Sequence, residues 1–175
     1  MAANFTPFVP GAVLTAAQLN GVVDNFQDIA IFNETQASGT NGGTFTSGSY
    51  VKRTLNTTVV NNITGCSIAS SVITLPAGSY QVIANCPAGS VNEHKIRIQD
   101  TTATTTLAIG GSQYAVASDN VWNNSEVQTF FTLSVSSTIE LQHRCGTTKN
   151  SNGFGVQTTF GDDEIFSQIT IVRVA

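Results

Sequence analysis

The sequence predicts a mainly β protein, an antiparallel jelly-roll sandwich preceded by a short N-terminal arm and a helix. From about residue 50 to the C-terminus, short stretches alternate apolar and polar residues with a period of two, as half-buried strands do. Turn-forming residues separate these stretches, for example at residues 76–78 and 110–111. No repeat is visible, so roughly eight to ten short strands favour a jelly roll over a propeller or solenoid.

The clearest β signal lies in residues 73–89, which read as strand, tight turn and strand. Ile73 and Leu75 alternate with a polar residue, and Tyr80 and Val82 begin a second alternation after the turn. The same criteria predict strands at residues 50–55, 57–60, 66–69, 71–75, 80–86, 94–99, 105–109, 127–135, 138–145 and 164–174.

Size and composition fit one globular domain with a modest appendage. The chain has 175 residues, of which 41% are hydrophobic, so it can bury a core. The net charge is −4 and the few basic residues are scattered, which argues against nucleic-acid binding. No stretch approaches about 18 uninterrupted apolar residues, and no signal-peptide pattern opens the chain. We therefore expect no membrane partner and synthesis in the cytoplasm.

The N-terminal region predicts an extended arm followed by an amphipathic helix. Two prolines within residues 4–11 exclude a helix there, and Thr15 with Gln18 forms a capping box. A helix of about 18 residues can either dock on its own domain or form a short trimeric coil. The candidate residues for attachment or trimerisation are Phe5, Phe8, Val9, Leu14, Leu19, Val22, Phe26 and Ile29.

A Gly-, Thr- and Asn-rich segment separates this region from the β-domain. Residues 33–43 lack periodicity and contain Gly39, Gly42 and Gly43, which is typical of a flexible linker. The predicted organisation is an attachment region at 1–32, a linker at 33–43 and a jelly-roll domain at 44–175.

The titratable residues give no support for catalysis, a metal or a cofactor. Strand parity places His94 and His143 on the apolar faces of their strands, where buried structural histidines are expected. Three carboxylates at 162–164 lack the spacing of a calcium loop. No nucleophile, zinc-hydrolase or nucleotide motif is present, so we expect a non-enzyme. Three widely spaced cysteines, Cys66, Cys86 and Cys145, are expected to be buried free thiols.

One polar stretch contains aromatic residues suited to sugar stacking. Loops on a rigid sandwich commonly carry recognition, and residues 147–152 form a second such segment. The candidate receptor surface consists of Tyr114, Trp122, Asn123, Asn124 and Asn150.

Several segments of the β-domain resemble the C-terminal domains of phage fibre and decoration proteins. They are residues 75–80 (LPAGSY), 93–100 (EHKIRIQD), 109–111 (IGG), 131–133 (FTL), 139–145 (IELQHRC) and the ending at 164–174. Those domains are similar to the trimeric jelly rolls of tumour necrosis factor and complement heads. The resemblance implies a homotrimer with one sheet of each protomer buried around a three-fold axis.

Residues 10–20 (PGAVLTAAQLN) resemble an N-terminal motif of phage tail fibres and other virion appendages. The two resemblances together imply a structural protein of a phage virion, assembled in the host cytoplasm. It would be a short fibre, spike or capsid decoration protein that contacts other virion proteins through its N-terminus. The alternative is a carbohydrate-binding module of a tail fibre, with a host surface glycan as partner.

Overall fold

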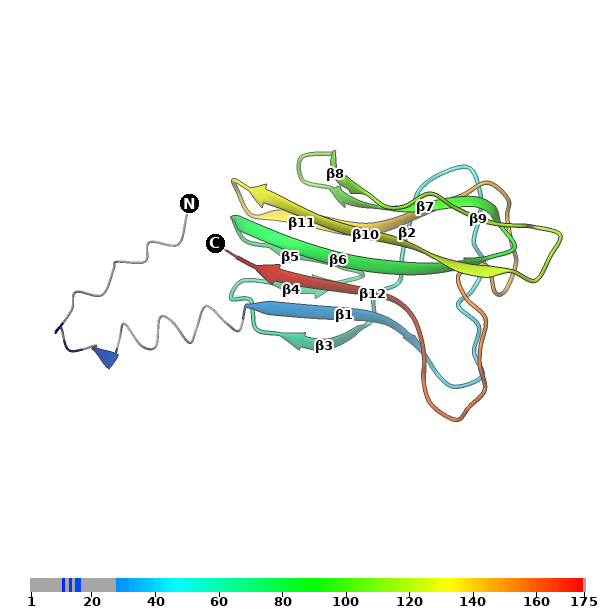
Figure 1. Ribbon diagram of the computed structural model, residues 1–175, viewed down its shortest axis with the longest axis horizontal. Coiled ribbons are helices and arrows are strands. Elements are labelled where there is room, and N and C mark those ends of the chain that lie inside the picture. Colours follow the sequence, from blue (N-terminus) through cyan, green and yellow to red (C-terminus); the bar gives the residue numbers. More distant parts are fainter. Residues whose placement is uncertain (1–10, 12, 14, 17–27, 175) are drawn as a thin grey trace.

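The computed structural model describes residues 28–174 together with Gly11, Val13, Thr15 and Ala16. Two antiparallel sheets face each other and enclose the core between them (Figure 1). The mainly β class is therefore confirmed. The predicted arm and most of the predicted helix lie outside the described residues, and so do Phe5, Phe8, Val9, Leu14, Leu19, Val22 and Phe26.

The first sheet, called the β6 sheet here, has the strand order β10-β6-β12-β1-β3. Its strands are β10 (Trp122–Leu133), β6 (Gly78–Gly89), β12 (Glu164–Arg173), β1 (Ile29–Gln36) and β3 (Thr57–Asn61).

The second sheet, the β11 sheet, has the order β4-β5-β11-β7-β8, with β2 paired to β11 and β9 paired to β7. Its strands are β4 (Ser67–Ala69), β5 (Val72–Leu75), β11 (Ser137–Cys145), β7 (Asn92–Asp100), β8 (Thr105–Ile109), β2 (Val51–Lys52) and β9 (Gln113–Ala115).

The core is built by the period-two pattern that the sequence displays. Val82 and Ala84 of β6 point inward and are buried, and Ile98 and Leu141 of the β11 sheet face them. Each of the Val, Ile and Leu side chains contributes about 1.5–3 kcal/mol when it is fully removed from water. The residues between them along each strand form the outer faces of the sandwich.

The start of the β-domain differs from the sequence prediction. Ile29–Gln36 form strand β1, which pairs with β12 on one side and β3 on the other. Ala30 and Phe32 are fully buried in the core. The predicted end of the helix and the start of the predicted linker are therefore wrong, and Ile29 belongs to a strand. The cause is tertiary, because pairing with the distant β12 supplies the partners that this strand needs.

Two strands also extend beyond their predicted ends, and β9 was not predicted. β6 continues through Pro87 to Gly89, where the sequence indicated a turn, and β10 begins at Trp122 rather than at residue 127. The two strands pair along this whole length, from Trp122 opposite Gly89 to Leu133 opposite Gly78. Trp122 thus lies on a strand at the edge of a sheet and not in a loop.

A buried ion pair joins the two sheets at the loop end of the sandwich, opposite the end at which β1 begins. Arg53 and Glu34 are 1% and 2% exposed, and the Arg53 Nε donates to the Glu34 carboxylate over 2.8 Å. The remaining guanidinium donors reach the carbonyls of Pro87, at 3.4 Å, and Phe154, at 3.0 Å. The guanidinium also lies 4.1 Å from the centre of the Phe154 ring. These contacts connect β1, β6, the segment after β2 and the loop before β12.

We expect Arg53→Met to lower the free energy of unfolding by about 3–5 kcal/mol, because it leaves the Glu34 carboxylate buried without its partner. Urea unfolding at a fixed protein concentration measures the change. Lys52→Met is the matched control, since Lys52 forms a partly exposed pair with Glu140 and its loss should cost at most about 1 kcal/mol.

The double variant Glu34→Leu/Arg53→Met distinguishes two contributions to the free energy of unfolding: the cost of a buried charge without a partner, and the net stabilisation by the ion pair. It should be more stable than Arg53→Met alone, because no buried charge remains. Equal stability of the Arg53→Met and Lys52→Met proteins would contradict this account of the loop end.

Candidate functional site

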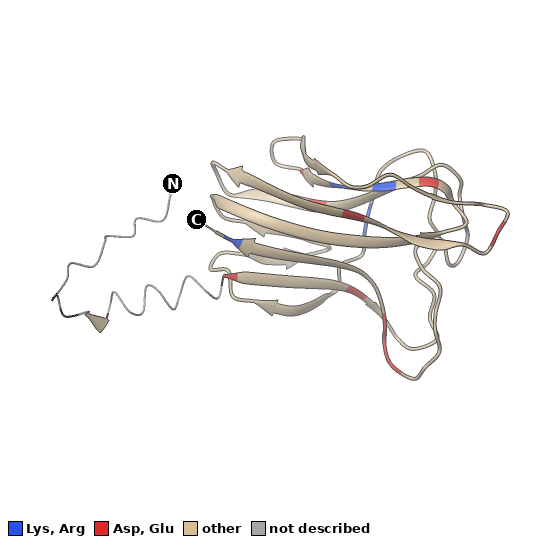
Figure 2. Cartoon of the chain, viewed as in Figure 1, with Lys and Arg blue, Asp and Glu red and all other residues tan. Residues whose placement is uncertain are grey.

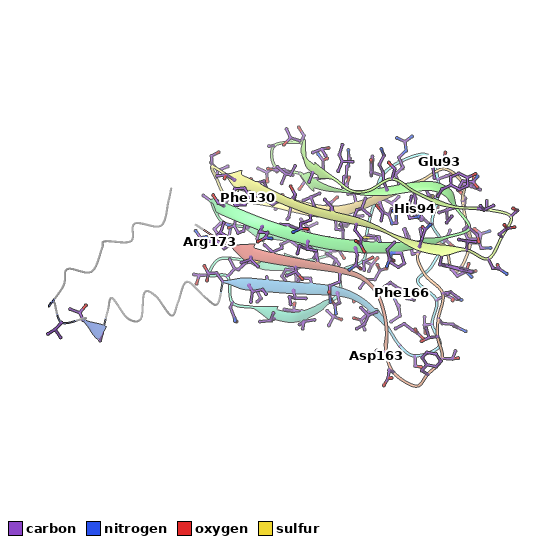
Figure 3. All side chains as sticks on the ribbon, viewed as in Figure 1. Glu93, His94, Phe130, Asp163, Phe166 and Arg173 are labelled. Atoms are coloured by element: carbon purple, nitrogen blue, oxygen red, sulfur yellow. The ribbon has the colours of Figure 1, made fainter. Side chains whose placement is uncertain are left out.

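A cleft of about 370 Å³ opens on the outer face of the β6 sheet, at the loop end of the sandwich. Its floor holds the side chains of Asn85, Asn124 and Gln168, and Pro87 and Trp122 line one side. The opposite wall consists of Gly155, Val156, Thr158 and the first residues of β12, from Glu164 to Phe166. Figure 3 labels Phe166 of this wall, which lies at the end of the sheet away from Phe130.

The cleft exists because β12 separates from β6 at this point. Their pairing runs from Arg173 opposite Tyr80 to Gln168 opposite Asn85 and stops there. Two residues further along β6 is Pro87, which has no backbone N–H to offer a neighbouring strand. β12 continues its pairing with β1 as far as Glu164, so a gap opens between β12 and the end of β6.

Trp122 closes one end of the cleft and is held against Gly89. The indole contacts the position that a Cβ at residue 89 would occupy, so only glycine fits there. The ring is half-buried, and its Nε1 is buried against Gly89 without a hydrogen-bond partner among the described residues. Trp122 therefore offers the cleft only an apolar ring surface.

Three side-chain amides lie side by side on the floor of the cleft. Gln168 and Asn85 are directly opposite each other across β12 and β6, and Asn124 lies on the neighbouring strand β10. The Gln168 Nε2 donates to the Asn33 Oδ1 at 3.0 Å. In the described part of the chain, the amides of Asn85 and Asn124 make no hydrogen bond. They are therefore free to bind a ligand that both donates and accepts hydrogen bonds.

Glu164 fixes the loop that forms the far wall. Its carboxylate accepts hydrogen bonds from the backbone N–H groups of Gly39, Thr158 and Thr159, at 3.2, 2.9 and 3.1 Å, and from the Thr158 hydroxyl at 3.0 Å. Burial alone would raise the pKa of this carboxyl, but these hydrogen bonds outweigh it and the pKa is lowered.

The carboxylates at 162–164 do not form a calcium site in this geometry. The Glu164 oxygens are occupied by the N–H and hydroxyl donors of the loop, while Asp162 and Asp163 are exposed. No group of three or more His, Cys, Asp or Glu side chains within the described residues is arranged to hold a metal ion.

Only part of the predicted receptor surface reaches the cleft. Trp122 and Asn124 line it, whereas Tyr114 is exposed on β9 and Asn150 is exposed in the loop after β11. Asn123 faces away from the cleft: its Nδ2 donates to the Tyr114 carbonyl at 3.0 Å. Sequence reasoning missed Asn85, Gln168 and Phe166, because nothing in one strand indicates which residues of other strands will be its neighbours.

His94 and His143 are buried, as the strand parity predicted, and they form a hydrogen-bonded pair that it did not predict. Since the Asn123 amide nitrogen donates to Tyr114, its Oδ1 accepts, and the His94 Nε2–H donates to it at 2.6 Å. The His94 Nδ1 is then an acceptor, and the His143 Nε2–H donates to it at 3.0 Å. This assignment leaves the His143 Nδ1 as a lone pair without a partner, and it makes both rings neutral.

Burial lowers the pKa of both histidines, and that of His143 lies well below its ordinary value. The hydrogen bond to Asn123 opposes this shift in the pKa of His94. The Arg53 guanidinium lowers both pKa values further, and His94 also lowers the pKa of His143. His143 packs against the rings of Phe45 and Phe154, with ring centres 4.6 and 6.4 Å away. The pair is thus a structural part of the core and not a pair of available bases.

Two of the three cysteines, Cys86 and Cys145, are buried, and Cys66 is half-buried. All three thiols are unpaired in the structure, and burial raises their pKa values to about 11. Thiols of this kind are weak nucleophiles at neutral pH.

Solved structures with the same fold come from animals and from a phage. The chain is similar to the globular domain of zebrafish complement 1qA, with 11% identity, a TM-score of 0.52 and coverage of 84% of this chain and 95% of that one. It is similar to the Eiger TNF of S. frugiperda, with 13% identity, a TM-score of 0.55 and coverage of 84% and 92%. Vertex protein P5 of phage PRD1 matches with 12% identity, a TM-score of 0.50 and coverage of 85% and 97%.

These similarities show that the chain is a jelly roll of the tumour-necrosis-factor and complement-head type, as the sequence predicted. No protein-family model matches the chain, and no curated protein matches it by sequence.

Because both histidines bind protons more weakly in the folded state, stability should be greatest above their ordinary pKa of about 6.5. Below that pH the two histidines bind protons in the unfolded chain but stay neutral in the folded chain. We expect stability to fall by up to about 1.4 kcal/mol per pH unit for each histidine. Thermal unfolding between pH 7.5 and 5.5 measures the slope.

His143→Gln is the informative variant, because it keeps an N–H donor for His94 but cannot be protonated. Its melting temperature should depend less steeply on pH than that of the unmodified protein. A melting temperature that does not change across this window in the unmodified protein would contradict the neutral, buried pair.

Proposed function

We propose that the chain is a non-enzymatic structural component of a bacteriophage particle: a short fibre, a spike or a capsid decoration protein. Its N-terminal region attaches to other virion proteins, and its jelly-roll head projects as a homotrimer. The likeness of the head to vertex protein P5 of phage PRD1 supports the phage assignment. The resemblance of residues 10–20 to phage attachment motifs adds independent support.

The observation that carries the oligomeric part of the proposal is an uncovered apolar region on the outer face of the β6 sheet. Phe130 of β10 is 61% exposed and Ile83 of β6 is 46% exposed, and both point away from the core. No described segment of the chain covers them. The exposed residues Gln81 and Gln128 lie directly opposite Phe130 and Ile83, so the two apolar side chains form a small patch within a mixed face. A partner that covers this patch would remove both apolar side chains from water.

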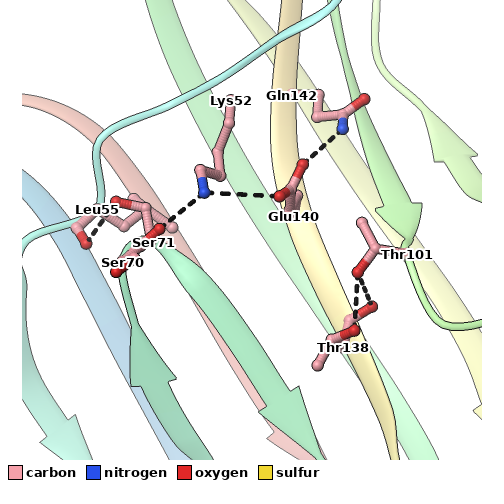
Figure 4. Close-up of polar contacts among 8 residues, drawn as sticks. All are labelled: Lys52, Leu55, Ser70, Ser71, Thr101, Thr138, Glu140 and Gln142. Atoms are coloured by element: carbon pink, nitrogen blue, oxygen red, sulfur yellow. Dashed lines mark hydrogen bonds and ion pairs between the residues drawn. The ribbon is translucent and has the colours of Figure 1, made fainter.

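The outer face of the β11 sheet is polar along β2 and β11, although Ile109 of the edge strand β8 is 63% exposed. Lys52 pairs with Glu140 at 3.6 Å and donates to the Ser70 carbonyl at 2.8 Å (Figure 4). The Gln142 amide donates to the same Glu140 carboxylate at 2.6 Å. The two faces together favour an oligomer in which the β6 sheets meet and the β11 sheets face water.

The distribution of charged residues and the burial of the histidines limit the partners and activities included in the proposal. Acidic and basic residues are dispersed over the head in Figure 2, without a basic stripe among the described residues. A nucleic-acid partner is therefore not part of the proposal. In the described part of the chain, no helix is long and apolar enough to cross a membrane. The histidines, which most often act as general bases, are buried in a structural hydrogen-bond chain.

The arrangement of the ends fits a head that projects from an attachment point. β1 begins and β12 ends at one end of the sandwich, where Ile29 pairs with Val172 (Figure 1). The long loops and the cleft lie at the other end. An attachment region before β1 would therefore hold the head with its cleft pointing outward, where a host surface glycan is the proposed partner.

Phe130→Glu should convert the trimer to a monomer, because it places a charge at the centre of the proposed contact. Light scattering at micromolar concentration measures the mass. Ile109→Glu is the matched control, since Ile109 is 63% exposed on β8 of the other sheet and should leave the mass unchanged. A trimer that survives Phe130→Glu would move the interface away from the β6 sheet.

Deletion of residues 2–27 should leave a folded head that no longer joins the phage particle. β1 begins at Ile29, so this deletion keeps the whole sheet. Deletion of residues 2–36 is the contrasting control: it removes β1 and should prevent folding, because Phe32 and Ala30 leave the core. Particles purified from a complemented phage mutant are tested for the protein, and normal incorporation of the 2–27 deletion would refute N-terminal attachment.

A further inference from the structure

We infer that the cleft between the end of β6 and the start of β12 binds an uncharged saccharide through Asn85, Asn124 and Trp122. The inference rests on the proposed outward-projecting head, but it does not depend on the trimer. It names the chemical class of ligand and the site, neither of which follows from the fold.

The size of the cleft suits a small ligand. Its volume of about 370 Å³ lies near the lower end of ligand-binding pockets, which span roughly 300–1,000 Å³. It has a defined floor made of three strands and two walls, one of them fixed by the hydrogen bonds to Glu164. The site is thus formed before any ligand arrives, which reduces the entropic cost of binding.

The charges around the cleft exclude most ionic ligands. Its lining contains no Lys, Arg or His, and its one carboxylate is Glu164. Asp162 and Asp163 add negative charge in the same loop. A phosphate, a nucleotide or an acidic sugar would meet repulsion without a compensating cation. A cationic ligand would gain little binding free energy from Glu164, because the Glu164 oxygens already accept hydrogen bonds from the loop.

The polar groups on the floor match hydroxyl groups. Each amide carries a donor and an acceptor, and a hydroxyl likewise donates and accepts. The side chains of Asn85 and Asn124 have no partner within the described residues. Asn124 is opposite Pro87, two residues along β6 from Asn85, and both amides line the cleft. A purely apolar ligand would leave these amides without hydrogen bonds and would lose affinity for that reason.

The cleft also has apolar surfaces that suit the C–H faces of a sugar ring. Sugars present C–H faces as well as hydroxyl rims, and Trp122 offers a ring surface beside the amides. Val156 and Ile165 provide exposed apolar surface on the opposite wall. Polyhydroxylated rings without charge are the ligands that use both kinds of surface together.

The cleft and the proposed trimer contact occupy different ends of the same sheet face. Asn124 and Phe130 are six residues apart on β10, which corresponds to roughly 20 Å along a strand. Contact between copies around Phe130 can therefore leave the cleft open at the loop end. Substitutions at the two places should act independently.

The test uses the full-length protein on a printed array of neutral and acidic bacterial surface glycans, followed by a fluorescence titration with the best neutral oligosaccharide. Trp122 is the single tryptophan of the chain, so its emission reports on the cleft directly. We expect neutral glycans to bind in preference to acidic ones and to change the Trp122 emission on titration.

Asn85→Ala and Asn124→Ala should each weaken binding about fivefold to tenfold, since each removes hydrogen bonds to the ligand. Asn150→Ala, an exposed asparagine outside the cleft, should leave affinity unchanged. Failure of every array glycan to bind, preference for acidic glycans, or unchanged affinity in both cleft variants would each overturn the inference. The cleft variants should keep the mass and the particle incorporation of the unmodified protein, so these readouts separate failure of the inference from failure of the proposed function.

Discussion

The buried ion pair between Arg53 and Glu34 is the constraint on which the loop end of this head depends. Removing two charges from water is costly, and the cost is offset only where every donor finds an acceptor. Here the acceptors come from β1, from the end of β6 and from the loop before β12. Three segments that are distant in the sequence are therefore fixed relative to one another, and His143 is buried beside them.

The cleft is a consequence of the same arrangement. The Pro87 carbonyl accepts a hydrogen bond from Arg53, and Pro87 has no N–H with which to extend the pairing to β12. The Phe154 carbonyl accepts a hydrogen bond from the same guanidinium, which also packs on the Phe154 ring. The next residues, Gly155 and Val156, line the cleft. The same two segments, around Pro87 and around Phe154, therefore contact the buried Arg53 and form part of the proposed binding surface.

One end of the outer face of the β6 sheet exposes Ile83 and Phe130 beside Gln81 and Gln128, and it is called the apolar end here. Phe130 lies toward the end of the sandwich at which β1 begins (Figure 3). The other end of this face contains the amides of the cleft. A head that associates near its base and binds ligands near its tip follows from this division.

The sequence was sufficient to predict the sandwich and most strands, because inward-facing residues such as Val82 and Leu141 repeat with a period of two. It was also sufficient to place both histidines in the core. It misassigned β1, because the spacing of Phe26 and Ile29 also fits a helix, and because the pairing of this strand with β12 is not local. Trp122 and Asn124 were identified by residue type, but Asn85 and Gln168 join them only through strand order.

The central claim is that the apolar end of the β6 sheet is covered by further copies of the same chain. Sedimentation equilibrium of the full-length, unmodified protein at micromolar concentration tests it most directly. The account predicts a single species with three times the chain mass of 18.4 kDa. A species of 18.4 kDa at that concentration would contradict it, because Ile83 and Phe130 would then face water without a partner.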